Sequence, residues 1–356
     1  MNSKQVSKKS GIRMLSPIAL PIILFLTVSS CQKEDLRQTQ LSKYQAAKTT
    51  KKTTPTTPTP PVVTTPTSTV PYKVSAPISL SGVNNLTISG DSIKGGTVPC
   101  ITLTNCTNIH ITHCKLFNST NVGVNLLNCV NVLVDSSYIS NVSTGVYATT
   151  SKTIQVVANQ MKNMVGPFPR GQFVQFNTCS GAGNSVINNK LENVLGASSP
   201  EDAISMYMTN GTAASPVMIS GNSIKGGGPS ASSGGIMLGD GGNSSYQTAQ
   251  NNTLVNCGAY GISVAGGSNM QVLNNQIFAA QNTFTNVGIC VWNQYATVSG
   301  CSVIIVSGNQ VNWTNAAGQA NGSWNNGNCG TVSGWSNNTW AANITSSILP
   351  SILTSL

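Results

Sequence analysis

Residues 251–277 read NNTLVNCGAYGISVAGGSNMQVLNNQI, and this stretch begins and ends with the same four-residue pattern. The pattern is a small polar pair, one variable residue and an apolar residue, as in Asn251-Asn252-Thr253-Leu254. It occurs ten times, with its second position at residues 91, 114, 137, 159, 189, 222, 252, 275, 309 and 338. Successive copies are 22 to 34 residues apart. A repeat of this length is typical of a solenoid, in which each unit stacks on its neighbours.

A second pattern lies between these copies and predicts a strand. A small residue is followed by apolar, variable and apolar residues, at 123–126, 145–148, 203–206, 235–238, 261–264 and 288–291. Alternation over so few positions indicates a half-buried strand. A further short strand precedes each polar pair, and stripes with a helical period are absent. We therefore predict an all-β fold, a single right-handed parallel β-helix of about ten coils, whose core contains Val124, Leu126, Val146, Ile204, Met206, Ile236, Leu238, Ile262, Val264, Ile289 and Val291.

Asparagine recurs at the second position of the first pattern, from Asn159 to Asn338. Two properties favour it there. Asparagine tolerates the left-handed backbone conformation of tight turns, and stacked asparagine side chains can hydrogen-bond along a ladder with strand spacing. A β-sandwich with regular turns gives no reason to repeat asparagine at one phase, so the β-helix is the favoured interpretation.

The repeats and ladders resemble the right-handed parallel β-helix proteins of the pectate-lyase-like superfamily over roughly residues 80 to 340. The resemblance implies the fold more specifically than the activity. The polygalacturonase-like set of Asn-Thr-Asp, Asp-Asp, Gly-His-Gly and Arg-Ile-Lys is missing from the sequence. The Asp-Pro-His-Glu of mannuronan epimerases and the calcium-binding nonapeptide repeat are also missing. No catalytic residue of that superfamily can therefore be assigned to this chain by motif.

The N-terminus has the order of an export signal. Basic residues from Lys4 to Arg13 precede an apolar run from Met14 to Val28, and Cys31 follows. The run is too short to cross a membrane. It resembles a bacterial lipoprotein signal, which implies that residues 1–31 are a signal peptide, that Cys31 is lipidated, and that the protein is an outer-membrane lipoprotein exposed at the cell surface.

Residues 32–74 are rich in threonine and proline and contain too little apolar surface to pack, so we predict a disordered tether. The formal net charge of +10 is concentrated before residue 75. The leader carries +4, the tether +5 and the β-helix, residues 75–356, only +1. The basic character therefore gives no argument for nucleic-acid binding, and we expect a monomer that contacts the membrane through its lipid anchor.

Cysteines and histidines do not indicate a metal site. Nine cysteines follow Cys31, and no pair is convincing as a disulfide. His110 and His113 are the only histidines, and no CxxC pair occurs. We expect no cofactor, with calcium at Glu201, Asp202 and Asp240 as the one alternative.

Long links emerge on one side of the predicted coils. They precede the strands at Val174, Ile204, Ile236 and Ile289, whereas early coils use short links. Loops on a rigid scaffold commonly carry function. The outward face of the adjoining strands presents amides, hydroxyls and aromatics, which suit sugar rings. The candidate catalytic residues are Arg170, Glu201, Asp202, Tyr207 and Asp240, and the candidate substrate-binding residues are Phe168, Gln175, Asn177, Ser205 and Trp292.

Other charged residues are given a structural interpretation. Lys162, Glu192 and Lys225 share one phase in three consecutive coils, which predicts a solvent-facing ladder of little energetic value. Asp202 and Asp240 differ in register by six residues, or roughly 20 Å in an extended chain, which is too far for a catalytic pair unless the loops fold over.

Three functions fit these residues, and the partner in each is an extracellular polysaccharide. The first is a polysaccharide lyase, in which a cation neutralises a uronate carboxylate and Tyr207 moves the proton. The second is a glycan-binding or adhesive rod without catalysis. The third is a hydrolase using an acid and a base among the carboxylates. The sequence leaves open whether the protein is an enzyme.

Overall fold

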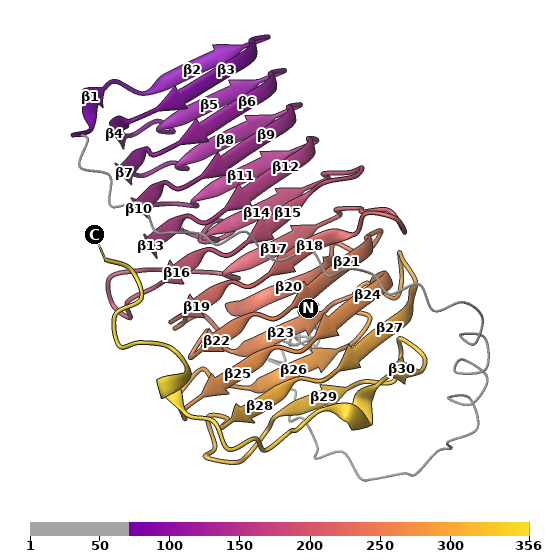
Figure 1. Ribbon diagram of the computed structural model, residues 1–356. Coiled ribbons are helices and arrows are strands. Elements are labelled where there is room, and N and C mark those ends of the chain that lie inside the picture. The colour runs from indigo at the N-terminus through magenta and orange to yellow at the C-terminus, as the bar shows by residue number, and fades with distance from the viewer. Residues whose placement is uncertain (1–70, 356) are drawn as a thin grey trace, which may run out of the picture. The chain divides into compact units, whose positions relative to one another are not determined.

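The computed structural model describes residues 71–355, which form three parallel sheets of ten strands each (Figure 1). Sheet A consists of β1 (Lys73–Ser75), β4 (Asp91–Gly96), β7 (Lys115–Ser119), β10 (Tyr138–Val142), β13 (Gln160–Met164), β16 (Lys190–Glu192), β19 (Ser223–Lys225), β22 (Thr253–Val255), β25 (Gln276–Ala279) and β28 (Gln310–Trp313). Sheet B consists of β2 (Ile78–Ser81), β5 (Ile101–Thr104), β8 (Val124–Leu127), β11 (Val146–Thr149), β14 (Val174–Asn177), β17 (Ile204–Tyr207), β20 (Gly234–Asp240), β23 (Tyr260–Val264), β26 (Val287–Val291) and β29 (Ser323–Asn325).

Sheet C consists of β3 (Asn84–Ser89), β6 (Thr107–Thr112), β9 (Val130–Asp135), β12 (Lys152–Val157), β15 (Ser185–Ile187), β18 (Val217–Ser220), β21 (Ser245–Gln250), β24 (Gly267–Leu273), β27 (Cys301–Ser307) and β30 (Val332–Ser333). Two short 3-10 helices, η1 (Trp335–Asn337) and η2 (Ser346–Ile348), complete the described part of the chain. Each coil gives one strand to each sheet, in the order A, B, C. The predicted all-β parallel β-helix of about ten coils is confirmed.

The core lies between the three sheets and is formed by the inward residue of each alternating pair. In sheet B, Val146 pairs with Val174, and Val174 with Ile204, so apolar side chains stack from coil to coil. All eleven core residues expected from the sequence are fully buried. Because each inward side chain contacts the coils above and below it, the apolar core runs through the whole stack.

The edge between sheets C and A is a two-residue turn stabilised by a buried asparagine ladder. The Oδ1 of Asn222 accepts hydrogen bonds from the backbone N–H of Asn189 and from its Nδ2, at 3.0 and 2.9 Å. Asn222 in turn donates both groups to Asn252. The left-handed conformation, however, belongs to the first residue of each turn, such as Asn188 with φ 56°. The first residue of the turn therefore adopts the left-handed conformation, and the second residue forms the hydrogen-bonded ladder.

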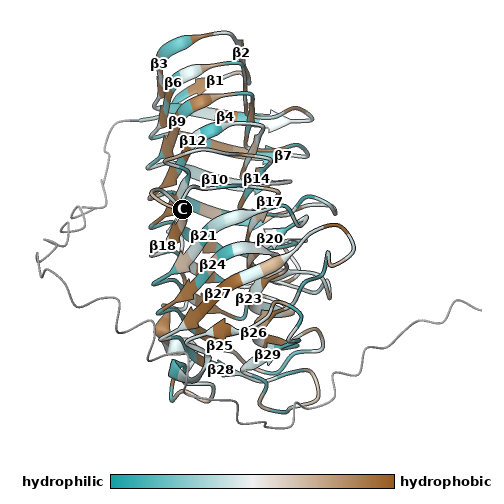
Figure 2. Ribbon diagram, turned by 90° about the vertical axis from the view of Figure 1, so that its right-hand side faces the viewer, coloured by the Kyte–Doolittle hydropathy of each residue, from teal (hydrophilic) through white to brown (hydrophobic). Residues whose placement is uncertain are grey.

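The edge between sheets A and B carries links of unequal length. Residues 165–173, 193–203, 226–233 and 280–286 form longer links, whereas residues 256–259 connect β22 directly to β23. Figure 2 shows such loops projecting beside β17 and β20. The loops expected from the sequence therefore lie along one edge of the stack.

The C-terminal residues run back over sheet A and cover part of it. Thr354 donates its backbone N–H and its hydroxyl to Glu192 Oε2, at 3.1 and 2.7 Å, and Leu349 and Leu353 pack with Val255. Glu192 is only 6% exposed and lies 3.6 Å from Lys162 Nζ. The expected register of the Lys162, Glu192 and Lys225 ladder is present, but its solvent-facing interpretation was wrong because this tail covers it.

One disulfide joins two adjacent coils near the C-terminal end. Cys301, at the start of β27, is bonded to Cys329, although the sequence suggested no pair. The other cysteines of the described range are free and buried. Equivalent turn positions in four successive coils are all buried, namely Cys106, Cys129, Ser151 and Cys179.

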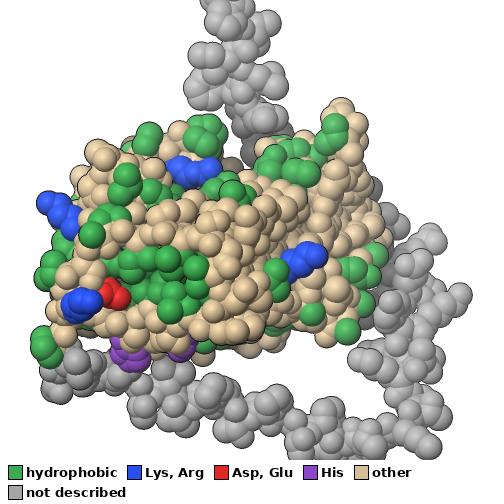
Figure 3. Space-filling view, turned by 90° about the horizontal axis from the view of Figure 1, so that it is seen from above, with side chains coloured by type: hydrophobic (Ala, Val, Ile, Leu, Met, Phe, Trp, Pro, Cys, Tyr) green, Lys and Arg blue, Asp and Glu red, His purple; other side chains and the backbone are tan. Residues whose placement is uncertain are grey.

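The N-terminal end of the stack is apolar. Ile78, Leu80, Val83 and Leu86 pack against the core but stay partly exposed, and Figure 3 shows hydrophobic side chains at this end. β1 begins at Lys73, two residues before the boundary expected from composition. The predicted signal peptide, Cys31 and nearly all of the predicted tether lie outside the described residues. Within residues 71–355, no helix is long and apolar enough to span a membrane.

Candidate functional site

The outward face of sheet B, next to the long links, gathers most of the polar side chains selected from the sequence. Parallel register places Tyr147 of β11, Gln175 of β14 and Ser205 of β17 in one row. The same register places Asn177 beside Tyr207 in the next row. Because outward residues are two apart on a strand, these rows form a polar surface across three coils.

Arg170 lies over this surface and contacts two of its residues, Tyr147 and Gln175. Its guanidinium carbon is 3.9 Å from the centroid of the Tyr147 ring. Its Nη1 donates a hydrogen bond of 2.6 Å to Gln175 Oε1. Asn177 Nδ2 donates to the Tyr147 hydroxyl oxygen at 2.8 Å. The link that carries Arg170 is fixed to the sheet by Gly171, whose N–H donates to Thr144 Oγ1 at 3.1 Å.

These contacts make Tyr147 more acidic than an ordinary tyrosine. Burial raises the pKa of its phenol, but hydrogen bonds with Thr149 and Asn177 and the charge of Arg170 outweigh burial, so the pKa is lowered overall. Arg170 is the only arginine in the described range. The cluster therefore combines one cation, two amides and a phenol whose ionised form is stabilised.

A second cluster lies where the link 193–203 joins β17. Asp202 is 9% exposed and accepts a hydrogen bond from the Tyr260 hydroxyl, two coils away. Glu201 accepts from Ser232 Oγ at 2.8 Å. Gly234 lies between Asp202 and Tyr260, and a Cβ at this position would be 2.1 Å from Tyr260 Cζ. The absent side chain at Gly234 therefore lets the Tyr260 ring cross one coil.

Asp202 is the carboxyl group with the strongest reason to keep its proton. Burial raises its pKa well above the usual range, and the Asp240 and Glu201 carboxylates raise it further, against the lowering effect of the Tyr260 hydrogen bond. The pKa of Tyr260 is also raised well above its ordinary value, chiefly by burial and by Asp202. Asp202 and Tyr260 therefore both lose their protons less readily than ordinary side chains of their kinds.

Asp240 reaches the same surface because of a β-bulge. The register of β17 and β20 shifts after Ser205, so Tyr207 pairs with Asp240. Equal spacing in the sequence would place Gly239 beside Tyr207, one residue away from the observed register. Gly239 has φ 71° and approaches Gly266 so closely that a Cβ would be 2.0 Å from the Gly266 carbonyl oxygen. This left-handed residue creates the extra position.

The bulge gives Asp240 two hydrogen-bond donors. Tyr295 donates its hydroxyl to Oδ1 at 2.5 Å, and Ser205 donates to Oδ2 at 3.3 Å. Burial and the Asp240 carboxylate raise the pKa of Tyr295. Asp240 also influences the pKa of Asp202, so the two carboxyl groups are within electrostatic reach in the folded chain despite their separation in register.

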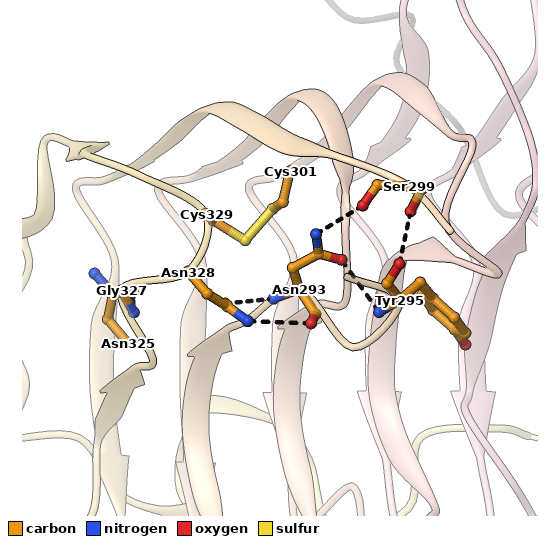
Figure 4. The surroundings of a disulfide bond; sticks show 8 residues. All are labelled: Asn293, Tyr295, Ser299, Cys301, Asn325, Gly327, Asn328 and Cys329. Carbon is orange, nitrogen blue, oxygen red and sulfur yellow. Dashed lines mark hydrogen bonds between the residues drawn. A yellow bond between two sulfur atoms is a disulfide. The ribbon is translucent and has the colours of Figure 1, made fainter. Parts of the chain in front are cut away.

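The loop that carries Tyr295 is anchored beside the disulfide (Figure 4). Asn293 Oδ1 accepts the Tyr295 N–H at 3.1 Å, and Asn293 Nδ2 donates to the Ser299 carbonyl at 2.9 Å. The Asn293 N–H donates to Asn328 Oδ1 at 2.7 Å. Because Cys329 follows Asn328 directly and is bonded to Cys301, the disulfide and the asparagine pair hold both ends of this loop.

Among the other predicted residues, Tyr207 pairs in register with Asn177 of the Arg170 cluster. Phe168 is at the tip of its link and is 72% exposed. Tyr207 lies against Gly241, whose Cβ would be 2.8 Å from the Tyr207 ring. Trp292 follows β26 and packs at 5.7 Å, ring centroid to ring centroid, with Trp324. This aromatic pair therefore lies at the same sheet as the polar surface, several coils further along the stack.

Sequence reasoning missed several partners at these sites. Tyr147 is not among the residues selected from the sequence, and neither are Tyr260, Tyr295, Ser232 and Trp324. The one available signal was the position of Tyr147 in the row with Gln175 and Ser205. Among residues 71–355, no three His, Cys, Asp or Glu side chains are grouped so that they could hold a metal ion. Calcium at Glu201, Asp202 and Asp240 stays a prediction.

Comparison with known proteins supports the fold. No protein-family model matches the sequence, and no curated protein matches it. An alginate lyase from Paenibacillus sp. str. FPU-7 is similar in structure, with a TM-score of 0.50 and 13% identity, over 73% of this chain and 93% of that chain. The tailspike protein of E. coli bacteriophage HK620, solved with a pentasaccharide, has a TM-score of 0.35 and 15% identity over 65% of this chain and 48% of that chain.

Proposed function

We propose that this protein is a polysaccharide lyase that cleaves an extracellular polysaccharide containing uronate residues. The observation that carries the proposal is the Arg170 guanidinium lying over Tyr147, with the pKa of Tyr147 lowered. A lyase needs a cation at the uronate carboxylate and a base for the proton on the adjacent carbon. The Arg170 cluster offers both on the outward side of sheet B, with Arg170 and Tyr147 partly exposed.

The roles of the residues follow from their contacts. Arg170, with the Gln175 and Asn177 amides, would hold the carboxylate. The Tyr147 phenolate would accept the proton from carbon 5, the electrons of that bond would form the carbon 4–carbon 5 double bond, and the bond to the leaving oxygen would break. Asp202, whose pKa is raised well above its usual range by burial, is the candidate donor to the leaving oxygen. Tyr147 replaces Tyr207 as the favoured base because Arg170 and Asn177 contact it.

A panel of uronate polysaccharides tests this proposal. Wild-type protein should produce unsaturated uronate ends on at least one member of the panel. Tyr147→Phe should lower turnover by about 100-fold or more, because the base is lost while the ring is kept. Tyr246→Phe on sheet C is the matched control and should retain activity. Absence of unsaturated products from every uronate polymer would contradict the proposal.

Non-catalytic glycan binding is the second candidate, and the Trp292 and Trp324 pair favours it. Aromatic rings bind the apolar faces of sugars without any need for charge. In that case Trp292→Ala should abolish polysaccharide binding, whereas Tyr147→Phe should leave it unchanged. A hydrolase is the third candidate, favoured by the different environments of Asp202 and Asp240. It would produce reducing ends without unsaturation.

We also propose that the protein is a surface lipoprotein of an outer membrane, anchored through Cys31. The order of basic residues, apolar run and cysteine supports this location. Cys31→Ala should release the protein from the membrane or block its maturation, because lipid chains provide the attachment. Membrane fractionation of the variant at the wild-type level would contradict the anchor.

A further inference from the structure

The edge between sheets A and B has a gap where residues 256–259 form a short link between longer ones. A cavity of 210 Å³ fills this gap. The links 193–203, 226–233 and 280–286 contribute most of its lining. Its lining includes Asn193, Leu195, Asn256, Ala280, Asn282 and Phe284, and no lining residue belongs to the Arg170 or Asp202 clusters.

Three asparagines in this lining share one hydrogen-bonding arrangement. The side-chain oxygen of each accepts a backbone N–H: Asn193 from Met164, Asn256 from Ala280, and Asn282 from Thr283. Their Nδ2 groups have no acceptor among the described residues. Asn193 is 5% exposed, and its Nδ2 is buried without a partner. A buried donor without an acceptor costs free energy, whereas the Nδ2 groups of the exposed Asn256 and the half-buried Asn282 are free to donate to an oxygen-bearing ligand in the cavity.

The rest of the lining is uncharged and mostly apolar, with Gln281 and Thr285 as its only other polar side chains. Leu195 is 57% exposed, and the half-buried Phe284 ring lies against Gly228. The floor at Gly226 and Gly227 is bare backbone, because a Cβ there would be within 2.0 Å of the carbonyl oxygens of Asn193 and Cys257. Lys225 is adjacent in sequence, but its Nζ donates to carbonyl groups of the C-terminal tail.

We propose that this cavity is a second carbohydrate-binding site and that it takes one uncharged sugar unit. Amide N–H groups would donate to ring hydroxyl oxygens, and Phe284 and Leu195 would contact the apolar C–H face. The absence of a charged side chain among the lining residues distinguishes this site from the surface beneath Arg170. The inference concerns a different part of the stack and holds whether or not sheet B carries a lyase.

Titration calorimetry with neutral trisaccharides of glucose, galactose and mannose tests the site, with a triuronate as the charged comparison. At least one neutral trisaccharide should bind wild type in the millimolar range and more tightly than the triuronate. Ala280→Phe, at an exposed position, should fill the cavity and weaken binding by about tenfold or more. Phe284→Ala should weaken it similarly, and Arg170→Ala should leave it unchanged.

Three results would overturn the proposal. The first is that no neutral trisaccharide binds wild type at tens of millimolar. The second is equal or tighter binding of the triuronate. The third is unchanged binding in Ala280→Phe and Phe284→Ala proteins that melt as cooperatively as wild type. Because Arg170→Ala removes the proposed uronate contact and is not part of this cavity, loss of lyase activity is separable from loss of neutral-sugar binding.

Discussion

The edge between sheets C and A and the edge between sheets A and B turn the same chain with different kinds of residues. At the first edge, asparagines are bonded to one another in every late coil, and those from Asn159 to Asn309 are fully buried. At the second edge, the links differ in length from coil to coil and carry Arg170, Glu201 and Phe284. The repeated edge therefore holds the coils together, whereas the varied edge carries the groups that can contact a ligand.

Removing one rung of the ladder should have the largest effect on stability. Asn222→Ala leaves the Asn189 backbone N–H without its acceptor and removes the bonds that Asn222 Nδ2 donates to Val186 and Asn252, whereas Asn189 Nδ2 keeps its bond to the Val156 carbonyl. We expect the free energy of unfolding to fall by about 3 kcal/mol, because a buried N–H and buried acceptors would be unpaired. Denaturant unfolding measures this. Asn177→Ala, on the half-exposed face of sheet B, is the matched control and should cost less than about 1 kcal/mol. Equal costs would remove the distinction between the two regions.

A methyl group at Gly234 should separate Tyr260 from Asp202. Gly234→Ala should lower the free energy of unfolding by roughly 1–3 kcal/mol, because the new Cβ overlaps the Tyr260 ring. In a Tyr260→Ala background the same substitution should cost much less, since the overlapping ring is gone. A double-mutant cycle measures the difference. Additive effects would show that the ring does not cross this glycine.

Asp202 should weaken the fold near neutral pH. Its folded-state pKa is raised, so its contribution to stability is present below its unfolded pKa of about 3.9 and is lost as pH rises through the folded value. Asp202→Asn should therefore gain on the order of 1 kcal/mol relative to wild type by pH 7, with the gain growing from about pH 4. Unfolding measured at several pH values tests this sign. A stability difference that shrinks as pH rises would contradict it.

Glu192 should show the opposite sign and the smallest effect. Burial opposes its ionisation, but hydrogen bonds from Thr354 and the charge of Lys162 lower its pKa overall. Its stabilising contribution is present above its unfolded pKa of about 4.3 and is lost as pH falls through the folded value. Glu192→Gln should cost about 1 kcal/mol or less at pH 7 and nothing in strong acid. Lys190→Ala, away from the tail, is a control that should show no such pH dependence.

The sequence predicted what is local and repeated. The asparagine ladder and the core from Val124 to Val291 follow from periodicity, because each coil imposes the same environment on the next. The long links were also predicted, since their lengths are visible in the spacing. Arg170, Gln175 and Asn177 were selected from the sequence. The contact of Arg170 with Tyr147 was not predicted, because it depends on how the loop 165–173 folds back over sheet B.

Features that depend on one irregular residue or on a distant segment could not be predicted. The left-handed Gly239 shifts the register by one and brings Asp240 beside Tyr207. The cover over Glu192 comes from Thr354, which is 162 residues later in the chain. Tyr260 reaches Asp202 only because Gly234 lacks a side chain. None of these contacts has a periodic signal.

One paired measurement tests the division between the two edges most directly. Turnover of a uronate polysaccharide and the free energy of unfolding are measured for Arg170→Ala and Asn222→Ala. For Arg170→Ala we predict a loss of turnover of about 100-fold or more with stability within about 0.5 kcal/mol of wild type. For Asn222→Ala we predict lower stability with turnover retained at temperatures where the variant is folded. Full turnover in Arg170→Ala would contradict the account.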